Sequence, residues 1–368
     1  MSPATSAAKG AAPSPASSSS PGSSSPAPHH PLPQWDQLTF SFTETDWMYR
    51  ANGDKRRSPV WDKGELVPLA DLTLSPAAAF MSYGLGVFEG LKAQRTPDGR
   101  VLLFRPDKNG ERLGKSAERL SMPAFPADQF VEACIEMVRR NLRFVPPPGQ
   151  GSFYLRPMQL AVEAKLGLGP CNQFLVIIYG SPVGAYFTGG APKGVRLQVL
   201  EQGRVAPGGT GYAKAMGNYA GGIYIANQWK EKGFDDVLYL DARHLRFVTE
   251  TSGSNVFLLR KDGVIVTPAL DDQILPGVTR DSTIRVARDI LHRKVEERPL
   301  PIEEVVEAGA ELFCTGTAWT LQSVREIVYR GKTVQFASEE TRKSLLEVIR
   351  GIQTGTGEDV FGWTREVR

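Results

Sequence analysis

The most constraining stretch of the sequence is the apolar run that begins at Gln173 and reads QFLVIIYG. Apolar residues occupy consecutive positions rather than alternate ones, so a strand formed there must be buried on both faces. The run is far shorter than the roughly 20 apolar residues that cross a bilayer. We therefore expect a sheet covered on both sides, in a fold of the mixed α+β or α/β class.

Other segments extend this pattern of short strands and helices. RVLLFRP and GSFYLRPMQL are predicted strands, and AERLSMPAFPADQFVEACIEMVRRNLRF is predicted to hold one long amphipathic helix. After the apolar run, SPVGAYFTGGAPKG is rich in glycine and proline and interrupts the pattern. A chain of 368 residues exceeds what one core ordinarily holds. We predict a small domain over residues 35–181, a linker over 182–193 and a larger domain over 194–368.

The second half of the sequence has its own regular features. A helix is predicted between an N-cap at Asn218 and a terminating glycine at Gly233. The segments DDVLYLD, LRFVTE, NVFLLR and GVIVTP are predicted to form a β-meander. The segment ILPGVTRDSTIRVARDIL indicates a Pro-Gly turn and then a helix capped by Thr279. AELFCTGTAWTLQSV indicates a strand, a turn of small residues, and another strand or the start of a helix.

Composition and charge exclude several classes of function. The net charge is +3 and the basic residues are scattered, so we expect small-molecule partners rather than nucleic acid, and no membrane association. Three cysteines without a CxxC spacing indicate reduced thiols in a reducing compartment, which makes the cytoplasm the expected location. Only four histidines occur, and His29 and His30 lie in the N-terminal tail, so a histidine-based metal site is poorly supplied and no metal is expected.

The N-terminal tail, residues 1–34, consists almost entirely of Ser, Pro, Ala and Gly. Such a segment has too little apolar surface to offset the entropy of ordering, so we predict disorder. Its richness in serine and lack of acids are also features of organelle transit peptides, but it holds only Lys9 as a cation. A plain tail is the favoured interpretation, and targeting is the alternative.

One lysine in the second half stands without an acidic neighbour. Lys214 lies in GYAKAMGNYAGG, a segment of small residues with no Asp or Glu. A neutral lysine amine in such a setting can form a Schiff base with an aldehyde. Pyridoxal phosphate is the usual aldehyde, and it requires an acid at the ring nitrogen, a partner for the ring hydroxyl and an anion site. Glu250 at the end of a predicted strand and Tyr219, five residues after the lysine, meet the first two requirements.

The third requirement, an anion site, has candidates too. The helix predicted at Thr279 would offer free N–H groups and a favourable dipole, and Arg105 at a strand end can make a forked contact. Each residue also has an ordinary structural explanation. A loop lysine is usually a solvated charge, and Glu250 can be an ordinary carboxylate at a strand end. Arg105 can pair with Asp107 or Glu111, and Tyr219 can belong to a core. Spacing alone therefore leaves cofactor binding a minority hypothesis.

From Trp35 onward, the sequence resembles the branched-chain amino acid aminotransferases, which are pyridoxal-phosphate enzymes of fold type IV. Nine segments occur in the order typical of that family: TDWMY, YGLGVFEGLKA, FRPDKN, FYLRP, PVGAYF, KAMGNYAGG, GFDDVLYLD, ILPGVTR and FCTGTA. The resemblance implies a small N-terminal α/β domain and a larger C-terminal domain with a β-meander or pseudo-barrel. It also implies a homodimer that transfers amino groups from leucine, isoleucine and valine to 2-oxoglutarate.

The resemblance further implies roles for individual residues. Lys214 would be the Schiff-base lysine and the catalytic base, Glu250 the partner of the ring nitrogen, and Tyr219 the partner of the ring hydroxyl. The cofactor phosphate would be held by four residues: Arg105, Val278, Thr279 and Thr317. The substrate would be held by Tyr83, Phe88, Tyr154, Arg156, Tyr186, Thr317 and Ala318, together with Leu166 and Leu168 of the second subunit.

Three departures from the family pattern bear on the choice of substrate. Trp319 follows the GTA segment, where small residues are usual, and it either reshapes the pocket or packs behind the turn. The loop after YLRP lacks the glycines of relatives and carries Glu163 and Lys165. The CxxC of some relatives is absent, with Trp319 and Gln322 in its place.

Several alternative functions stay open at this stage. They include a D-amino acid transaminase, an amine transaminase or a lyase of the same fold, and a specialised transaminase for an aromatic or non-standard amino acid. A non-catalytic descendant would require a missing anchor residue, and none is missing.

Overall fold

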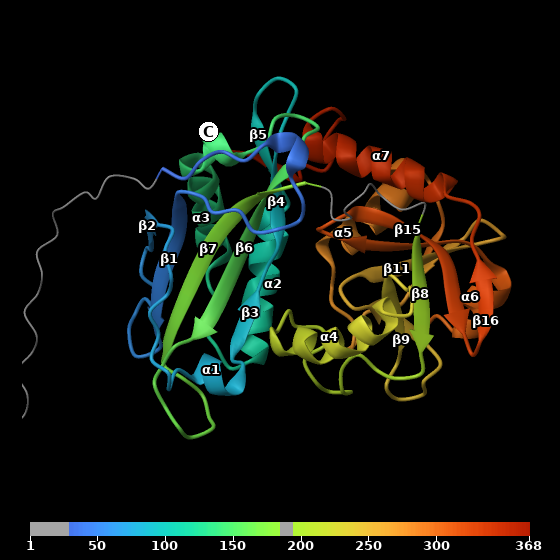
Figure 1. Ribbon diagram of the computed structural model, residues 1–368, viewed down its shortest axis with the longest axis horizontal. Coiled ribbons are helices and arrows are strands. Elements are labelled where there is room, and N and C mark those ends of the chain that lie inside the picture. The colour runs from blue at the N-terminus through green and yellow to red at the C-terminus, as the bar shows by residue number, and fades with distance from the viewer. Residues whose placement is uncertain (1–28, 185–193) are drawn as a thin grey trace, which may run out of the picture.

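The computed structural model describes residues 29–184 and 194–368. Most of the predicted linker, and with it Tyr186, lies outside the described residues. The described chain forms two sheets that lie side by side in Figure 1, the earlier half of the chain on the left and the later half on the right. Within residues 29–184 and 194–368, no helix is long and apolar enough to cross a membrane.

The described part of the first half, residues 29–184, contains two short 3₁₀ turns, three helices and seven strands. The helical elements are η1 (Trp35–Gln37), α1 (Ala79–Tyr83), α2 (Pro106–Arg119), α3 (Ala127–Arg140) and η2 (Leu142–Phe144). The strands are β1 (Trp47–Asp54), β2 (Glu65–Pro68), β3 (Gly86–Phe88), β4 (Leu91–Arg95), β5 (Val101–Phe104), β6 (Ser152–Ala161) and β7 (Gln173–Val183).

The second half adds four α-helices, one π-helical turn and ten strands. The helical elements are α4 (Gly217–Lys230), α5 (Val278–Arg285), η3 (Val286–Ile290), α6 (Ile302–Ala308) and α7 (Glu340–Thr354). The strands are β8 (Val195–Leu200), β9 (Asp236–Leu240), β10 (Val248–Thr251), β11 (Asn255–Arg260), β12 (Ile265–Thr267), β13 (Val295–Glu297), β14 (Gly309–Gly316), β15 (Thr320–Tyr329), β16 (Lys332–Gln335) and β17 (Thr364–Glu366).

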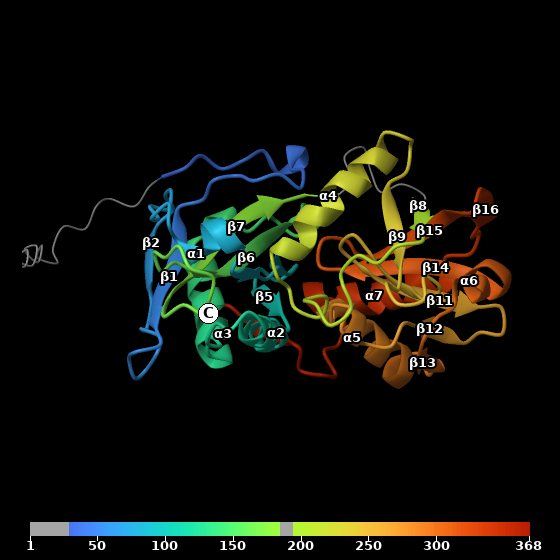
Figure 2. The same cartoon turned by 90° about the horizontal axis from the view of Figure 1, so that it is seen from below.

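The first sheet is antiparallel and runs in the order β17-β5-β4-β6-β7-β1-β2, with β3 paired to β6. The predicted strand at the apolar run is confirmed as β7, near the centre of the sheet. Helices α2 and α3 cover one face, as Figure 2 shows, and a core of 27 buried residues lies beneath them. On the other face Leu175 and Ile177 pack in a second cluster with Phe80. Burial on both faces explains why the run has no polar alternation.

The second sheet closes on itself and forms a barrel-like domain. Its order is β10-β9-β8-β15-β14-β11-β12-β13, and Glu250 of β10 also pairs with Asn255 of β11. The predicted meander from β9 to β12 is confirmed by antiparallel pairing of successive strands. The last strand, β17, returns to the first sheet, where Arg365 pairs with Leu103. The proposed division at the linker stays a prediction, and it would need to assign this strand to the small domain.

Two predicted helix caps are wrong. Helix α4 begins at Gly217, so Asn218 lies inside the first turn, and its side chain instead donates to the carbonyl groups of Thr210 and Ala213. Helix α5 begins at Val278 after Gly277, so Thr279 lies in the first turn and is not the N-cap. Short polar side chains bond whichever nearby backbone group is free, and for Asn218 the preceding loop supplies it.

Candidate active site

The backbone around Lys214 joins the two halves of the molecule. Its carbonyl accepts a hydrogen bond from the Phe88 N–H at 3.1 Å, and its own N–H donates to Ser116 Oγ at 2.9 Å. Two residues later, the Met216 N–H donates to the Gly86 carbonyl at 3.0 Å. These bonds fix the loop before α4 against β3 and α2, so the lysine projects from a held backbone at the junction of the two sheets.

The Lys214 amine meets a hydroxyl and an aromatic ring. Its Nζ donates to the Tyr219 hydroxyl at 3.0 Å and lies 4.6 Å from the centre of the Phe88 ring. The Tyr219 and Phe88 rings meet edge to face, with centroids 4.9 Å apart. In the described ranges 29–184 and 194–368, no carboxylate forms an ion pair with Lys214. Tyr219 thus orients the amine, and no described carboxylate pairs with it.

Glu250 is buried beside this cluster and has a partner that the sequence did not reveal. Burial raises the pKa of the Glu250 carboxyl to about 7, while the nearby charges of Arg204 and Lys214 oppose that rise. Arg204 Nη2 lies 2.5 Å from Glu250 Oε1, with both side chains almost fully buried. Asn255 and the Leu275 N–H lie 3.4 Å from the other carboxyl oxygen. The carboxylate is therefore held rigidly at the end of β10.

A small hollow at the start of α5 is the candidate anion site. Val278, Thr279 and Thr317, which are predicted to hold the phosphate, all line it. The first backbone N–H groups of a helix lack intrahelical partners and favour an anion there. Thr317 Oγ1 donates to the Gly90 carbonyl at 3.1 Å, which ties the GTA turn to the first sheet. The three predicted residues are thus brought together.

Arg105 contacts the helix that forms the hollow, and its role in holding a phosphate stays a prediction. Its guanidinium lies 2.8 Å from Ser282 Oγ and 2.7 Å from the Asp281 carboxylate, both on α5. It also stacks on Trp363, with 4.6 Å between the guanidinium carbon and the ring centre. Its buried Nε has no hydrogen-bond partner among the described residues. Arg105 therefore stabilises the turn that forms the hollow and keeps one donor free, rather than pairing with Asp107.

The predicted substrate residues fall into two groups. Arg156 Nη2 lies 3.5 Å from the Tyr154 hydroxyl, and its guanidinium lies 5.0 Å from the centre of the Phe88 ring, so these two residues join the Lys214 cluster. Tyr83 is different, because its hydroxyl donates to the Leu166 carbonyl on an exposed loop. Leu166 and Leu168 are 90% and 82% exposed.

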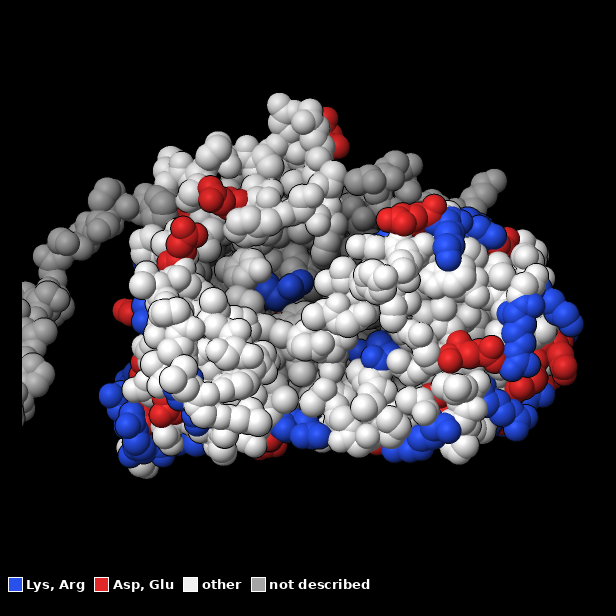
Figure 3. Space-filling view, turned by 60° about the horizontal axis from the view of Figure 1, so that its bottom comes forward, with Lys and Arg blue, Asp and Glu red and all other residues white. Residues whose placement is uncertain are grey.

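Beside the cluster lies a cavity of about 710 Å³. Its wall includes Tyr219, Arg204, Ala318 and Trp319. This volume is typical of small-molecule sites. Trp319 both lines the cavity and packs against the core of the second sheet, so neither interpretation of this residue excludes the other. The space-filling view in Figure 3 shows basic atoms at the floor of a hollow between the two halves.

Sequence reasoning did not find two further contacts made by buried charged side chains. Glu89 is fully buried and pairs with Arg112, whose Nη1 donates to the Pro276 carbonyl ahead of α5. Lys92 Nζ donates to the Ala318 carbonyl at 2.6 Å. Glu89 lies in the apolar segment VFEGL, and a buried acid there requires a positively charged partner. The sequence alone does not show which residue that partner is. Both contacts fasten the first sheet to turns of the barrel.

The arrangement fits pyridoxal phosphate. A lysine amine held by a tyrosine hydroxyl, a buried carboxylate, and a helix start backed by an arginine with a free buried Nε supply the three features that this aldehyde requires. The described ranges contain no cluster of His, Cys, Asp and Glu able to hold a metal ion.

Comparison with known proteins leads to the same family. The model of the amino-transferase class IV family matches residues 86–327. A mitochondrial branched-chain amino acid aminotransferase from Humulus lupulus is 43% identical over 90% of this chain and 84% of its own length. A methionine aminotransferase from Arabidopsis thaliana is 41% identical over 91% of this chain and 93% of its own length.

A solved structure supports the fold. A T.th. branched-chain amino acid aminotransferase with pyridoxamine 5′-phosphate matches with a TM-score of 0.71 and 29% identity, over 88% of this chain and 99% of that one. The predicted type IV fold is therefore confirmed. The chain belongs to the class IV aminotransferases, and it is an enzyme that uses pyridoxal 5′-phosphate as its cofactor.

Proposed function

We propose that the enzyme transfers the amino group of leucine, isoleucine or valine to 2-oxoglutarate, giving branched-chain 2-oxo acids and L-glutamate. The observation that carries this proposal is the Lys214 amine 3.0 Å from the Tyr219 hydroxyl, in a chain 43% identical to a branched-chain aminotransferase. Purified protein, assayed with each of the three amino acids and 2-oxoglutarate, should form glutamate. Absence of glutamate with all three would overturn the proposal.

The proposed chemistry rests on a few side chains. Bound pyridoxal phosphate supplies an electron sink for negative charge at the substrate α-carbon. Lys214 Nζ would take the proton from the substrate α-carbon as a general base and then deliver it, as an acid, to the carbon of the bound cofactor that retains the amino group. The Tyr219 hydroxyl, 3.0 Å away, keeps that amine in one position between transfers. The Phe88 ring covers one side of the amine and limits access of water.

Binding and electrostatics fall to other residues. The Glu250 carboxylate, kept in place by Arg204, would hold a positive ring nitrogen in a setting sealed from water. The N–H groups at Val278 and Thr279 would hold the phosphate. Substrate carboxylate would meet the turn at Thr317–Ala318, with Tyr154 and Arg156 nearby in the same cluster.

We propose that the active enzyme is a homodimer. Leu166 and Leu168 expose nearly all of their apolar surface, and the Tyr83 hydroxyl holds their loop by a backbone contact. A second copy that buried these leucines would gain hydrophobic free energy and complete the neighbouring pocket.

Light scattering after size exclusion tests this proposal. The wild type should elute with the mass of a dimer, and Leu166→Asp with Leu168→Asp should shift the population toward monomer and lower activity. The control is Leu245→Asp, since Leu245 is 43% exposed and has a left-handed backbone that Asp tolerates. A monomeric, fully active wild type would refute the dimer.

A second candidate is a transaminase for a longer or aromatic side chain. It is favoured by Trp319 in the cavity wall and by the relative named as a methionine aminotransferase. Values of kcat/KM for leucine, isoleucine, valine, methionine, phenylalanine and D-alanine separate the candidates. We expect the branched-chain substrates to lead. A lead for methionine or phenylalanine would favour the second candidate, and a lead for D-alanine would exclude both.

The location is a separate proposal. The composition favours the cytoplasm, but the Humulus relative is named as mitochondrial, and residues 1–34 are the segment to examine. Fluorescent fusions of the full chain and of residues 35–368 should both fill the cytosol. Organelle fluorescence that depends on residues 1–34 would overturn this location.

A further inference from the structure

A second cavity, of about 620 Å³, lies between β4, the start of β15 and α7. We call it the basic cleft. Its lining residues include four cations, Lys92, Arg95, Arg342 and Arg350, and no Asp or Glu. The neutral donors Gln94, Ser152, Gln353 and Thr354 also reach its wall. Among the described residues it is thus a concave surface with one sign of charge.

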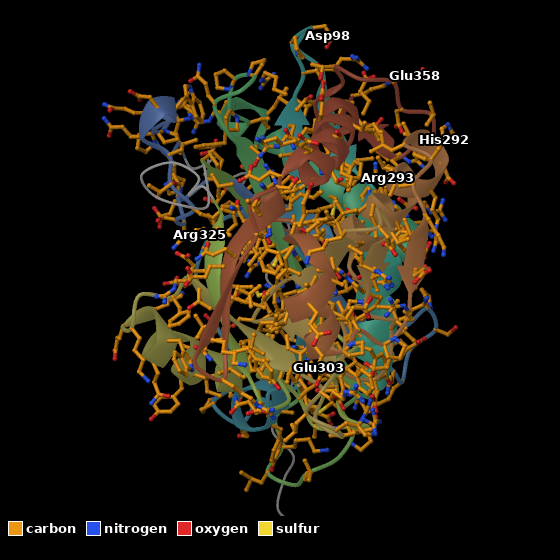
Figure 4. All side chains as sticks on the ribbon, turned by 90° about the vertical axis from the view of Figure 1, so that its right-hand side faces the viewer. Asp98, His292, Arg293, Glu303, Arg325 and Glu358 are labelled. Carbon is orange, nitrogen blue, oxygen red and sulfur yellow. The ribbon has the colours of Figure 1, made fainter. Side chains whose placement is uncertain are left out.

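Nearby acids neutralise little of that charge. Arg342 lies 3.1 Å from Glu339. Among the described residues, this is the only ion pair made by a cation that lines the cleft. Asp98, on the β4–β5 turn, is engaged by Arg100 at 2.8 Å. In Figure 4 Asp98 and Glu358 lie at the outer edge of the molecule, away from the body of α7. Most of the positive charge in the cleft is therefore left without a counter-ion.

The other cations bond neutral groups or none. Lys92 Nζ donates to the Ala318 carbonyl, and Arg95 donates to the carbonyl groups of Leu142 and Gly99. Arg350 is exposed and forms no ion pair with a described residue. Burial and the charge of Arg350 lower the pKa of the Lys92 amine to about 8. Burial and mutual repulsion disfavour the charged form of these cations, and an anion that binds between them would stabilise it.

We propose that the basic cleft binds a compact anion that carries two or more carboxylate or phosphate groups. The guanidinium groups that β4 and α7 bring to the cleft match planar carboxylates and phosphates, which accept paired hydrogen bonds. The cavity volume falls within the usual range for small-molecule sites. A multivalent anion satisfies several cations at once, whereas a monovalent one leaves most of them unpaired.

The cleft is separate from the site around Lys214 but touches it. Ala318 and Trp319 line both cavities, and Lys92 ties the cleft to the Ala318 carbonyl. An anion in the cleft therefore changes the surroundings of the turn at which we place the substrate carboxylate. This link rests on the proposed function, whereas anion binding itself does not.

Calorimetric titration of the cofactor-loaded, full-length protein with citrate, inorganic pyrophosphate and acetate at low salt tests the proposal. We expect citrate or pyrophosphate to bind once per chain, and acetate to bind at least tenfold more weakly. The tighter of the two multivalent probes identifies the carboxylate or the phosphate class. Failure of both to bind, or acetate binding as tightly, would overturn the site.

Variants show where the probe binds. Arg350→Gln removes an exposed guanidinium and should weaken binding of the tighter probe about tenfold. The affinity of Arg350→Lys should lie between those of the wild type and Arg350→Gln. Lys343→Gln is the control, because it removes the same charge from the same helix at a residue outside the cleft lining. Arg156→Gln should leave the affinity unchanged. Equal weakening by the Arg350 and Lys343 variants, or loss of binding in Arg156→Gln, would overturn the proposal.

Discussion

Replacing Glu250 by glutamine should change how the stability of the cofactor-free protein depends on pH. Burial raises the pKa of this carboxyl to about 7, against an ordinary value of 4.5. The folded protein then binds the Glu250 proton more tightly than the unfolded chain does, so the free energy of unfolding falls as pH rises from 4.5 through 7. The full loss is on the order of 3 kcal/mol, and most of it falls between pH 5 and pH 8.

Glutamine cannot ionise, so Glu250→Gln lacks this loss. Urea unfolding of both proteins at pH 5 and pH 8 gives a difference in stability at each pH. The hydrogen bonds altered by the substitution and the unpaired Arg204 contribute at both pH values, and they cancel when the two differences are compared. We expect the difference to move by roughly 2–3 kcal/mol in favour of the variant between pH 5 and pH 8.

Two results would refute this reasoning. A difference that stays constant between pH 5 and pH 8 means that Glu250 has an ordinary or lowered pKa in the folded protein, and a shift in favour of the wild type means that burial does not raise its pKa. Glu303→Gln is the control, because a backbone hydrogen bond and the nearby Arg246 lower the pKa of this exposed carboxyl. This carboxyl therefore titrates at and below pH 4.5, and the stability difference of Glu303→Gln should stay nearly constant between pH 5 and pH 8.

Three further substitutions test the site. Tyr219→Phe removes the hydroxyl 3.0 Å from Lys214 Nζ and should lower kcat about tenfold with little change in the urea midpoint; an unchanged kcat would argue against its orienting role. Arg156→Gln should raise KM for the amino acid about tenfold while kcat changes little, and steady-state kinetics with the reverse split would place Arg156 outside substrate binding. Arg204→Met leaves Glu250 buried without its counter-ion and should cost about 3–5 kcal/mol in the free energy of unfolding at pH 8; a loss below about 1 kcal/mol would show that the pair is not buried.

The parts of the fold that could be predicted are those in which neighbouring residues carry the signal. The apolar run at Gln173 requires burial on both faces, and β7 meets that requirement. Lys214 and Tyr219 lie five residues apart, so a loop and one helical turn suffice to bring them together. The meander joins successive strands by short turns, which local sequence marks clearly.

The missed features depend on contacts between distant residues. Lys92 and Ala318 are 226 positions apart, and Arg112 and Pro276 are 164 apart, so no local pattern links them. The predictions of the helix caps were wrong for a different reason. Asn218 had two sets of backbone partners within reach, and tertiary placement of the loop decided between them.

Direct identification of the amine that carries the cofactor tests the central claim most sharply. Borohydride reduction of the loaded enzyme makes the cofactor linkage permanent, and mass spectrometry of the digested protein then locates it. We expect the phosphopyridoxyl label on the peptide that contains Lys214, and no label at that peptide in Lys214→Ala. A label on a different lysine, or an unlabelled Lys214 in active enzyme, would contradict the assignment of this residue.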